Sequence, residues 1–226
     1  MINQAIFIII PSYNEEVVLR STVEPLLQRG YDIVVVDDGS QNDQAIVVTD
    51  LPVTVIRHQQ NLGQGAALET GTQYALQKGA SFIVHFDADG QHDYSDVENL
   101  LSPLYTNNTD VVFGSRFLSE QSSLPFLRSI LLHTARYVNF LFTGLLLTDA
   151  HNGLRAYNRK AADLIRITEN RMAHASEILL LVKKNKLRFI EVPVKVSYTD
   201  YSRTKGQSGW NSIRILFDLL LHKLLR

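Results

Sequence analysis

Two aspartates separated by one residue, Asp87 and Asp89, follow directly on a short apolar segment, Phe82–Phe86. Side chains alternate along a strand, so two carboxylates at this spacing point to the same side of a strand end. Mg²⁺ and Mn²⁺ prefer oxygen ligands, and proteins often share them between one or two carboxylates and the phosphates of a substrate. The pair therefore indicates a divalent cation beside a phosphate-bearing ligand. Asp and Gly are also common turn residues, so a plain turn is the alternative.

The segments around this pair predict an α/β fold with a mostly parallel sheet. Apolar runs typical of buried strands occur at Ala5–Ile10, Ile33–Val36, Val53–Ile56, Phe82–Phe86 and Val111–Phe113. Between them we expect helices from Ser12 or Asn14 to about Arg29, from the Asn61–Gly65 stretch to about Lys78, and from a cap at Ser95. Strands that alternate with helices in this way predict right-handed crossovers between parallel strands.

The pattern changes after Arg116. We expect a long amphipathic helix over about Pro125–Leu147, a short Gly153–Tyr157 segment, a helix containing Glu177–Lys184, apolar pieces around Pro193, a polar loop over Thr199–Gly209, and an amphipathic helix over about Trp210–Leu225. The apolar faces of the long helix and of the last helix suit a protein core. They suit a helix lying in a membrane interface as well.

Composition excludes several classes of protein. The chain has 226 residues, 45% of them hydrophobic, which fits one large domain or at most two small ones. Its formal net charge of −1 gives no reason to expect a nucleic-acid partner, and the lack of cysteine rules out disulfides and thiolate zinc sites. The first residues lack the basic region of a signal peptide. No apolar run reaches the roughly 18 residues expected of a transmembrane helix.

Polar residues follow four of the expected strands. They are the Tyr13–Glu15 stretch, the Asp37–Asp38 pair, the Asp87/Asp89 pair and Arg116. Ligands of open α/β sheets bind beyond the carboxyl ends of the strands. These residues therefore predict one binding site along that rim of the sheet.

Six blocks of the sequence carry a family resemblance. PSYNEE, VVDDGS, NLGQGAA, FDADGQH, GSRF and TDAHNGLRA, in this order, resemble the inverting family-2 glycosyltransferases of GT-A fold, and most of all the branch of dolichol-phosphate mannose synthases and polyprenyl-phosphate glycosyltransferases. The resemblance extends from Ile8 to about Gly209. It implies a single GT-A domain over residues 1–226, with a Rossmann-like mixed sheet and C-terminal amphipathic helices. Residues 1–117 would bind the nucleotide sugar, and residues 118–226 the acceptor and the membrane interface.

The resemblance also implies roles for individual residues. The nucleotide sugar, linked to UDP or GDP, would be bound by Pro11, Tyr13, Glu15, Asp38, Asp87, Ala88 and Lys205. A Mg²⁺ or Mn²⁺ ion would be bound by Asp87, Asp89 and Gln91, whereas His92 is expected at the surface or behind the ligands. Residues acting in catalysis would be Asp89, Arg116, Arg128 and Asp149. For Asp38, a turn before Gly39 is a second role that does not exclude the first.

The acceptor follows from the same comparison. An attacking alcohol must lose a proton and needs a general base, whereas a lipid monophosphate is already an anion and needs cations to position it. Arg116, Arg128 and Lys205 match phosphate-holding positions of similar enzymes, and Asp149 would orient a sugar hydroxyl or act as a base. One departure concerns the loop that commonly reads Arg-Gly-Glu-Ser-Lys. Here it reads Lys205-Gly-Gln-Ser-Gly209, with Arg203 as a substitute for the missing lysine.

The resulting hypothesis is a hexosyltransferase that acts on a polyprenyl phosphate at the cytoplasmic face of a membrane, to which it binds peripherally. A saccharide or protein hydroxyl as acceptor, and a nucleotide-sugar-binding module without turnover, stay open as alternatives. A dinucleotide-binding oxidoreductase is disfavoured, because the first strand leads into PSYNEE rather than a glycine-rich turn. The base, the sugar, the lipid length and the oligomeric state are left open.

Overall fold

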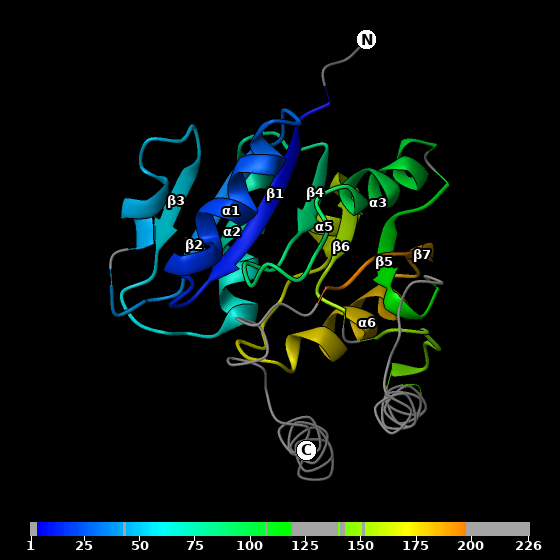
Figure 1. The fold of residues 1–226 in the computed structure, drawn as a ribbon. Helices are drawn as coiled ribbons and strands as arrows, with labels where there is room; N and C mark the ends of the chain where they lie inside the picture. The colour runs from blue at the N-terminus through cyan, green and yellow to red at the C-terminus, as the bar shows by residue number, and fades with distance from the viewer. Residues whose placement is uncertain are drawn as a thin grey trace.

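The computed structural model of the chain contains one sheet that lies between two layers of helices (Figure 1). It describes residues 4–42, 44–106, 108–118, 140, 143–150 and 152–197. In this part of the chain the sheet has seven strands in the order β3-β2-β1-β4-β6-β5-β7. Their bounds are β1 Ile6–Ser12, β2 Asp32–Asp37, β3 Thr54–Arg57, β4 Phe82–His85, β5 Val111–Ser115, β6 Arg155–Asn158 and β7 Phe189–Pro193.

The strand directions confirm the mostly parallel sheet. β1 is parallel to β2 and β4, β2 is parallel to β3, and β5 is parallel to β7. β6 is the exception, since it runs antiparallel to both β4 and β5 and pairs Arg155 with His85 and with Phe113. Because of this reversal, the residues just before β6 lie at the rim where β4 and β5 end. A loop from the second half of the chain thus reaches the predicted site.

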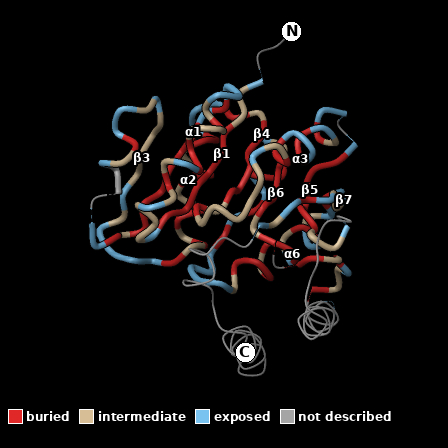
Figure 2. The backbone as a smooth tube through the Cα atoms, in the orientation of Figure 1, coloured by how far each residue is buried: buried red, intermediate tan, exposed pale blue. Residues whose placement is uncertain are grey.

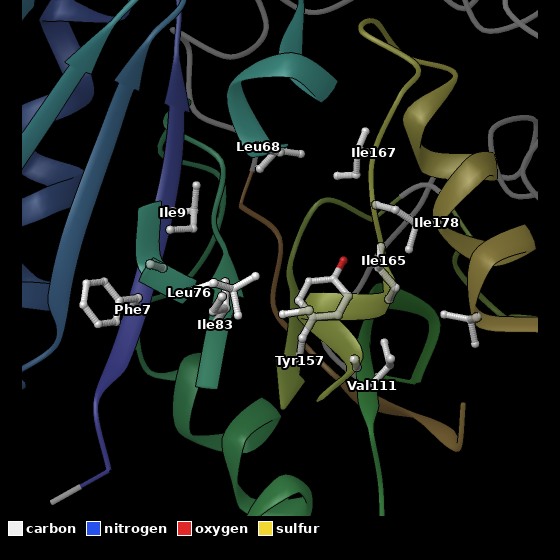
Figure 3. Close-up of a cluster of buried hydrophobic side chains, with 14 of the residues drawn as sticks. Phe7, Ile9, Leu68, Leu76, Ile83, Val111, Tyr157, Ile165, Ile167 and Ile178 are labelled. Atoms are coloured by element: carbon white, nitrogen blue, oxygen red, sulfur yellow. The ribbon is translucent and has the colours of Figure 1, made fainter. Parts of the chain in front are cut away.

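Helices cover both faces of the sheet, and each face has its own apolar cluster (Figure 2). α1 (Glu16–Leu27) and α3 (Asp96–Tyr105) pack on one face through leucines and valines such as Leu19, Leu26 and Leu101. α2 (Gln64–Gln77), α5 (Arg159–Leu164) and α6 (His174–Lys184) pack on the other (Figure 3). Two short 3₁₀ helices complete the described elements, Gln44–Val48 and Arg116–Leu118.

The structure corrects the two predicted helix caps. Ser12 is the last residue of β1, and α1 begins only at Glu16. Asn14 has a φ of 52° and is tied to the loop after β2, because its backbone N–H donates to Ser40 Oγ at 3.0 Å and its side-chain oxygen accepts from the N–H of Gln41 at 3.0 Å. Ser95 does precede α3, but its side chain makes no capping bond. At Asn14, contacts with the loop after β2 replace the cap.

The long amphipathic helix and the C-terminal helix fall mainly outside the described residues. Of the predicted Pro125–Leu147 helix, Phe140 and Thr143 are helical, and Gly144 follows with a φ of 69°. The last helical residue is therefore Thr143, four residues earlier than expected, since a left-handed glycine commonly terminates a helix. Residues 198–226 lie outside the description. None of the helices in the described ranges is long and apolar enough to cross a membrane.

Candidate active site

The predicted site residues meet at the carboxyl ends of β1, β2, β4 and β5. The backbone ties the ends of these strands to one another: the N–H of Asp38 donates to Ser12 O at 2.9 Å, and that of Phe86 donates to Ile9 O at 3.0 Å. Asp149 joins this rim through its contact with Arg116, described below. The sheet thus brings together the described candidates from both halves of the chain.

Asp87 is held from three sides. Its Oδ1 accepts a hydrogen bond from Gln64 Nε2, at the first residue of α2, at 2.8 Å. Its Oδ2 lies 3.2 Å from His92 Nε2. A Cβ added to Gly153 would lie 1.9 Å from the same oxygen, so only glycine fits there without a shift of the carboxylate. The orientation of Asp87 is therefore set by residues from α2, from its own loop and from the segment before β6.

Of the two carboxylates, Asp89 is the one whose ionised form is less stable. Burial, followed by the negative charge of Asp87, raises its pKa to about 6, and Glu15 adds to this effect. For Asp87, burial alone would raise the pKa, but the hydrogen bond from His92 and the positive charge of Arg155 hold it below its ordinary value. One oxygen of Asp89, Oδ1, accepts the N–H of Gln91 at 3.0 Å. Two neighbouring carboxylates of this kind favour the arrival of a cation.

The residues fit a divalent cation shared with a substrate. Within the described ranges no group of three or more His, Asp and Glu side chains is placed to enclose a metal. Magnesium, however, is usually held by one or two carboxylates together with substrate phosphates and water. Asp89, with Asp87 beside it, supplies that donor set. Burial and then the charge of Asp87 raise the pKa of Asp89, and a bound cation would favour its ionised form.

His92 takes one of its two expected positions, behind Asp87. Its side chain is 5% exposed, and its ring packs edge-on against Phe86 at 5.6 Å between centroids. Its backbone bridges to Val196, and the N–H of Ser197 donates to Gln91 O at 2.8 Å. His92 is not at the surface, because the chain after β7 covers this loop. The alternative, a place behind the ligands, is the one observed.

The predicted nucleotide-binding residues line the ends of β1 and β4. Tyr13 is 41% exposed, whereas Pro11 is buried within β1 and Ala88 is buried with its carbonyl oxygen accepting from Thr22 Oγ1 at 3.3 Å. Glu15 stands just before α1 and is near enough to raise the pKa of Asp89. An exposed tyrosine ring just after β1 suits one wall of a base slot, and the nucleotide-binding assignments stay predictions.

Asp38 has a structural task that the sequence did not reveal. Its carboxylate accepts the N–H groups of Leu62 and Gly63 at 2.9 and 2.7 Å and contacts His58 Nδ1 at 2.7 Å. It thereby fixes the turn that starts α2 and places Gln64 against Asp87. The turn after β2 is made by Asp37 instead, whose Oδ1 accepts the N–H of Ser40 at 3.0 Å. Base recognition by Asp38 stays a prediction.

Arg116 and Asp149 form a buried ion pair on the other side of β6. Arg116 Nε donates to Asp149 Oδ2 at 2.7 Å, and the backbone N–H of Arg116 donates to the same oxygen at 3.1 Å. Their side chains are 15% and 2% exposed. Asn152 Nδ2 adds a third donor to that oxygen at 3.2 Å. Asp149 therefore binds Arg116 directly. The sequence did not indicate that these two residues form a pair.

Arg155 is a further residue that the sequence did not single out. Its guanidinium is fully buried at the start of β6, and neither Nε nor Nη1 has a hydrogen-bond partner in the described part of the chain. Its charge contributes to the lowered pKa values of His85 and His174, for which burial is the larger cause. The available signal was an arginine directly before the apolar pair Ala156 and Tyr157.

Two predicted cations cannot be placed. Arg128 and Lys205, together with Arg203 and Gly209 of the departing loop, lie outside the described residues. The phosphate-holding role therefore rests, among the described residues, on Arg116. The arrangement offers two carboxylates, Asp87 and Asp89, of a kind suited to a cation and a diphosphate, and one guanidinium, that of Arg116, just after β5 on the far side of β6.

Comparison with known proteins gives consistent results. Residues 7–166 match the sequence model of Glycosyl transferase family 2. A UDP-N-acetylglucosamine–dolichyl-phosphate N-acetylglucosaminyltransferase from Methanococcus voltae is 33% identical over 99% of this chain and 98% of its own. A polyprenol monophosphomannose synthase from Mycolicibacterium smegmatis is 27% identical over 95% of this chain and 85% of its own. The fold resembles glucosyl-3-phosphoglycerate synthase from Mycobacterium tuberculosis in complex with Mn²⁺ and UDP-glucose, with a TM-score of 0.66, 20% identity, and coverage of 99% of this chain and 78% of that one.

Proposed function

We propose that this chain, which belongs to glycosyl transferase family 2 and is a glycosyltransferase, has a lipid phosphate as its acceptor. In this proposal it moves a hexose from a nucleotide sugar to a polyprenyl or dolichyl phosphate at a membrane surface. The reaction breaks the bond between the anomeric carbon and the diphosphate, and it forms a bond from that carbon to a phosphate oxygen of the lipid. The nucleoside diphosphate leaves with the bonding electron pair. No proton has to be removed from an ionised phosphate.

The donor half of the proposal rests on Asp87 and Asp89. A divalent cation bound there would neutralise the charge that develops on the leaving diphosphate. Asp87 is oriented for this role by Gln64 and His92, and Asp89 has a raised pKa that a cation would relieve. The relatives and the structural neighbour are named for UDP-linked donors or for a polyprenol-linked product, which supports a nucleotide-sugar donor.

The acceptor half rests on the Arg116–Asp149 pair, which is the observation that carries the proposal. A general base must keep a lone pair available for the proton of an alcohol. The side chain of Asp149 is only 2% exposed, and its Oδ2 accepts three hydrogen bonds, two of them from Arg116, so this carboxylate is shielded from an incoming alcohol and engaged by the guanidinium. An aspartate that orients a guanidinium suits an acceptor that is an anion from the start, since guanidinium binds phosphate oxygens with charge-assisted hydrogen bonds.

An acceptor comparison tests this function. The protein is incubated with UDP-N-acetylglucosamine, UDP-glucose or GDP-mannose, and each donor is offered with polyprenyl phosphate, with the matching polyprenol, or with no acceptor. We expect release of nucleoside diphosphate that requires polyprenyl phosphate, stops on chelation and returns with Mg²⁺ or Mn²⁺. Release with polyprenol but not with its phosphate would contradict the proposal.

A further inference from the structure

Glu191, on β7, makes an unusually dense contact with the turn that carries Asp149. Its Oε1 accepts the N–H of Thr148 at 2.8 Å, the hydroxyl of Thr148 at 2.7 Å and the N–H of Asp149 at 3.2 Å, and its Oε2 lies 2.9 Å from the N–H of Thr148. Glu191 itself is fixed by the sheet, where it pairs with Phe113 of β5. One carboxylate thus anchors the turn at residues 148–149 to the sheet.

The contacts continue from this turn to the site. Thr148 Oγ1 lies 2.6 Å from Ser115 Oγ at the end of β5. Asp149 Oδ2 accepts from the backbone N–H and from Nε of the next residue, Arg116. A chain of short polar contacts therefore leads from Glu191 through Thr148 and Asp149 to the guanidinium of Arg116. Residues that hydrogen-bond to a functional side chain and fix its orientation contribute strongly to the binding or activity of that side chain.

We propose that Glu191 is a positioning residue for the acceptor: it sets the Thr148–Asp149 turn so that Asp149 holds Arg116 in the orientation that binds the acceptor phosphate. This inference rests on the proposed function. Glu191 need not touch either substrate, since its carboxylate is engaged by the turn. Its loss should displace Arg116 and leave the metal-binding loop at Asp87 and Asp89 in place.

The chain provides its own matched control. Glu177, on α6, binds the Thr168–Glu169 turn in the same way, because its carboxylate accepts the N–H and the hydroxyl of Thr168 and the N–H of Glu169. The Glu177 contacts lie at an exposed turn and do not involve Arg116. Glu177→Ala therefore removes an equivalent set of hydrogen bonds without the proposed effect on the acceptor.

The kinetic test compares Glu191→Ala, Glu191→Gln and Glu177→Ala. We expect Glu191→Ala to lower kcat/KM for polyprenyl phosphate by about ten- to a hundredfold, the usual effect of losing a supporting residue, with KM for the donor unchanged. Glu191→Gln should recover much of this loss, because its amide oxygen can replace Oε1. Glu177→Ala should match the wild type in kcat/KM for polyprenyl phosphate at saturating donor, because its turn does not contact Arg116. Equal defects in Glu191→Ala and Glu177→Ala, or a rise in donor KM alone, would overturn the proposal.

Amide exchange decides the same question without turnover. In the unliganded protein, Glu191→Ala should speed exchange at Thr148 and Asp149, which lose their acceptor, and also at Arg116, whose N–H donates to Asp149 Oδ2. Glu177→Ala should speed exchange at Thr168 and Glu169 only. A wild-type exchange rate for Arg116 in Glu191→Ala would overturn the positioning role. If the wild type transfers no sugar to lipid phosphate, the proposed function fails, and the exchange of Arg116 still decides the role of Glu191.

Discussion

At the scale of single residues, Asp87 and Asp89 differ in how firmly their side chains are held. Asp87 is oriented by Gln64, His92 and the absence of a side chain at Gly153. Asp89 is bound less tightly and carries a raised pKa. A firmly oriented Asp87 next to a less tightly bound Asp89 suits a cation that arrives with the substrate and leaves with the product.

Replacing Asp89 tests the metal assignment. Asp89→Asn removes the charge but keeps the size, so we expect transfer to fall by roughly a hundredfold or more, as when one electrostatic stabiliser of a transition state is lost. Asp93→Asn is the control in the same loop, where Asp93 Oδ1 accepts the N–H of Ser95 at 2.8 Å. The measurement is initial rate against Mn²⁺ concentration. An Asp89→Asn variant with wild-type metal dependence would show that Asp89 is structural.

His174 makes stability depend on pH. Burial, and then the charge of Arg155, lower its pKa to about 4, so the folded protein holds the ring neutral where the unfolded chain protonates it. Protonation of His174 therefore stabilises the unfolded state as pH falls from about 6.5 to 4. The free energy of unfolding drops by up to about 3 kcal/mol compared with a protein that has a non-titrating residue at this position.

Urea unfolding of wild type and His174→Gln over pH 4 to 7.5 measures this effect. The difference in unfolding free energy between the two proteins should be constant above about pH 7 and should shift in favour of the variant as pH falls. Parallel curves over the whole range would show that His174 does not carry this pH dependence. The comparison cancels the other titrating groups, because both proteins contain them.

At the scale of elements, α2 determines how the site is held. Its first residue, Gln64, contacts Asp87, and its start is bound by Asp38. Its middle lies against the sheet at Gly71, where an added Cβ would be 2.3 Å from Ile9 Cγ2. The helix can take this position only because residue 71 has no side chain.

Gly71→Ala should destabilise the protein. Alanine is the better helix former by about 1 kcal/mol, but the overpacking against Ile9 costs roughly 1–3 kcal/mol, so we expect a net loss of stability. Gln77→Ala, at the exposed last residue of the same helix, should change stability by less than about 0.5 kcal/mol. Denaturant unfolding measures both, and a Gly71→Ala variant more stable than the wild type would contradict the close packing.

Sequence reasoning recovered the elements with strong apolar patterns. β1 to β5 and the helices after β1, β3 and β4 were predicted to within a few residues, because each is local in the chain. The place and direction of β6 were not predicted, since Arg155–Asn158 is short and polar at its ends and its partners are distant in sequence. Asp87 and Asp89 were visible as a motif. Glu191 was not, because its partners lie more than forty residues away.

At the scale of the whole molecule, one continuous sheet joins the two halves of the chain that are proposed to bind donor and acceptor. β6 and β7, from the second half, pair with β4 and β5 from the first. The residues proposed to bind the donor, at the end of β4, and those proposed to bind the acceptor, at the end of β5, therefore lie on the same sheet, with the turn before β6 between them. This arrangement suits a direct transfer from one bound substrate to the other.

Association with membranes is predicted from the sequence of the two amphipathic segments, about Pro125–Leu147 and Trp210–Leu225. Flotation with vesicles should show binding to anionic lipid that weakens as salt rises, since mobile ions screen exposed cations. Neutral vesicles are the control. A protein that stays wholly in the soluble fraction with anionic vesicles at low salt would favour a water-soluble hydroxyl acceptor.

The most direct test of the proposed function is the fate of the lipid phosphate itself. Phosphorus NMR follows polyprenyl phosphate during incubation with the protein, a nucleotide sugar and Mn²⁺. The proposal predicts that the monoester signal is replaced by a phosphodiester signal in step with release of nucleoside diphosphate, and that chelation stops both. Release of nucleoside diphosphate while the lipid phosphate remains a monoester would contradict it.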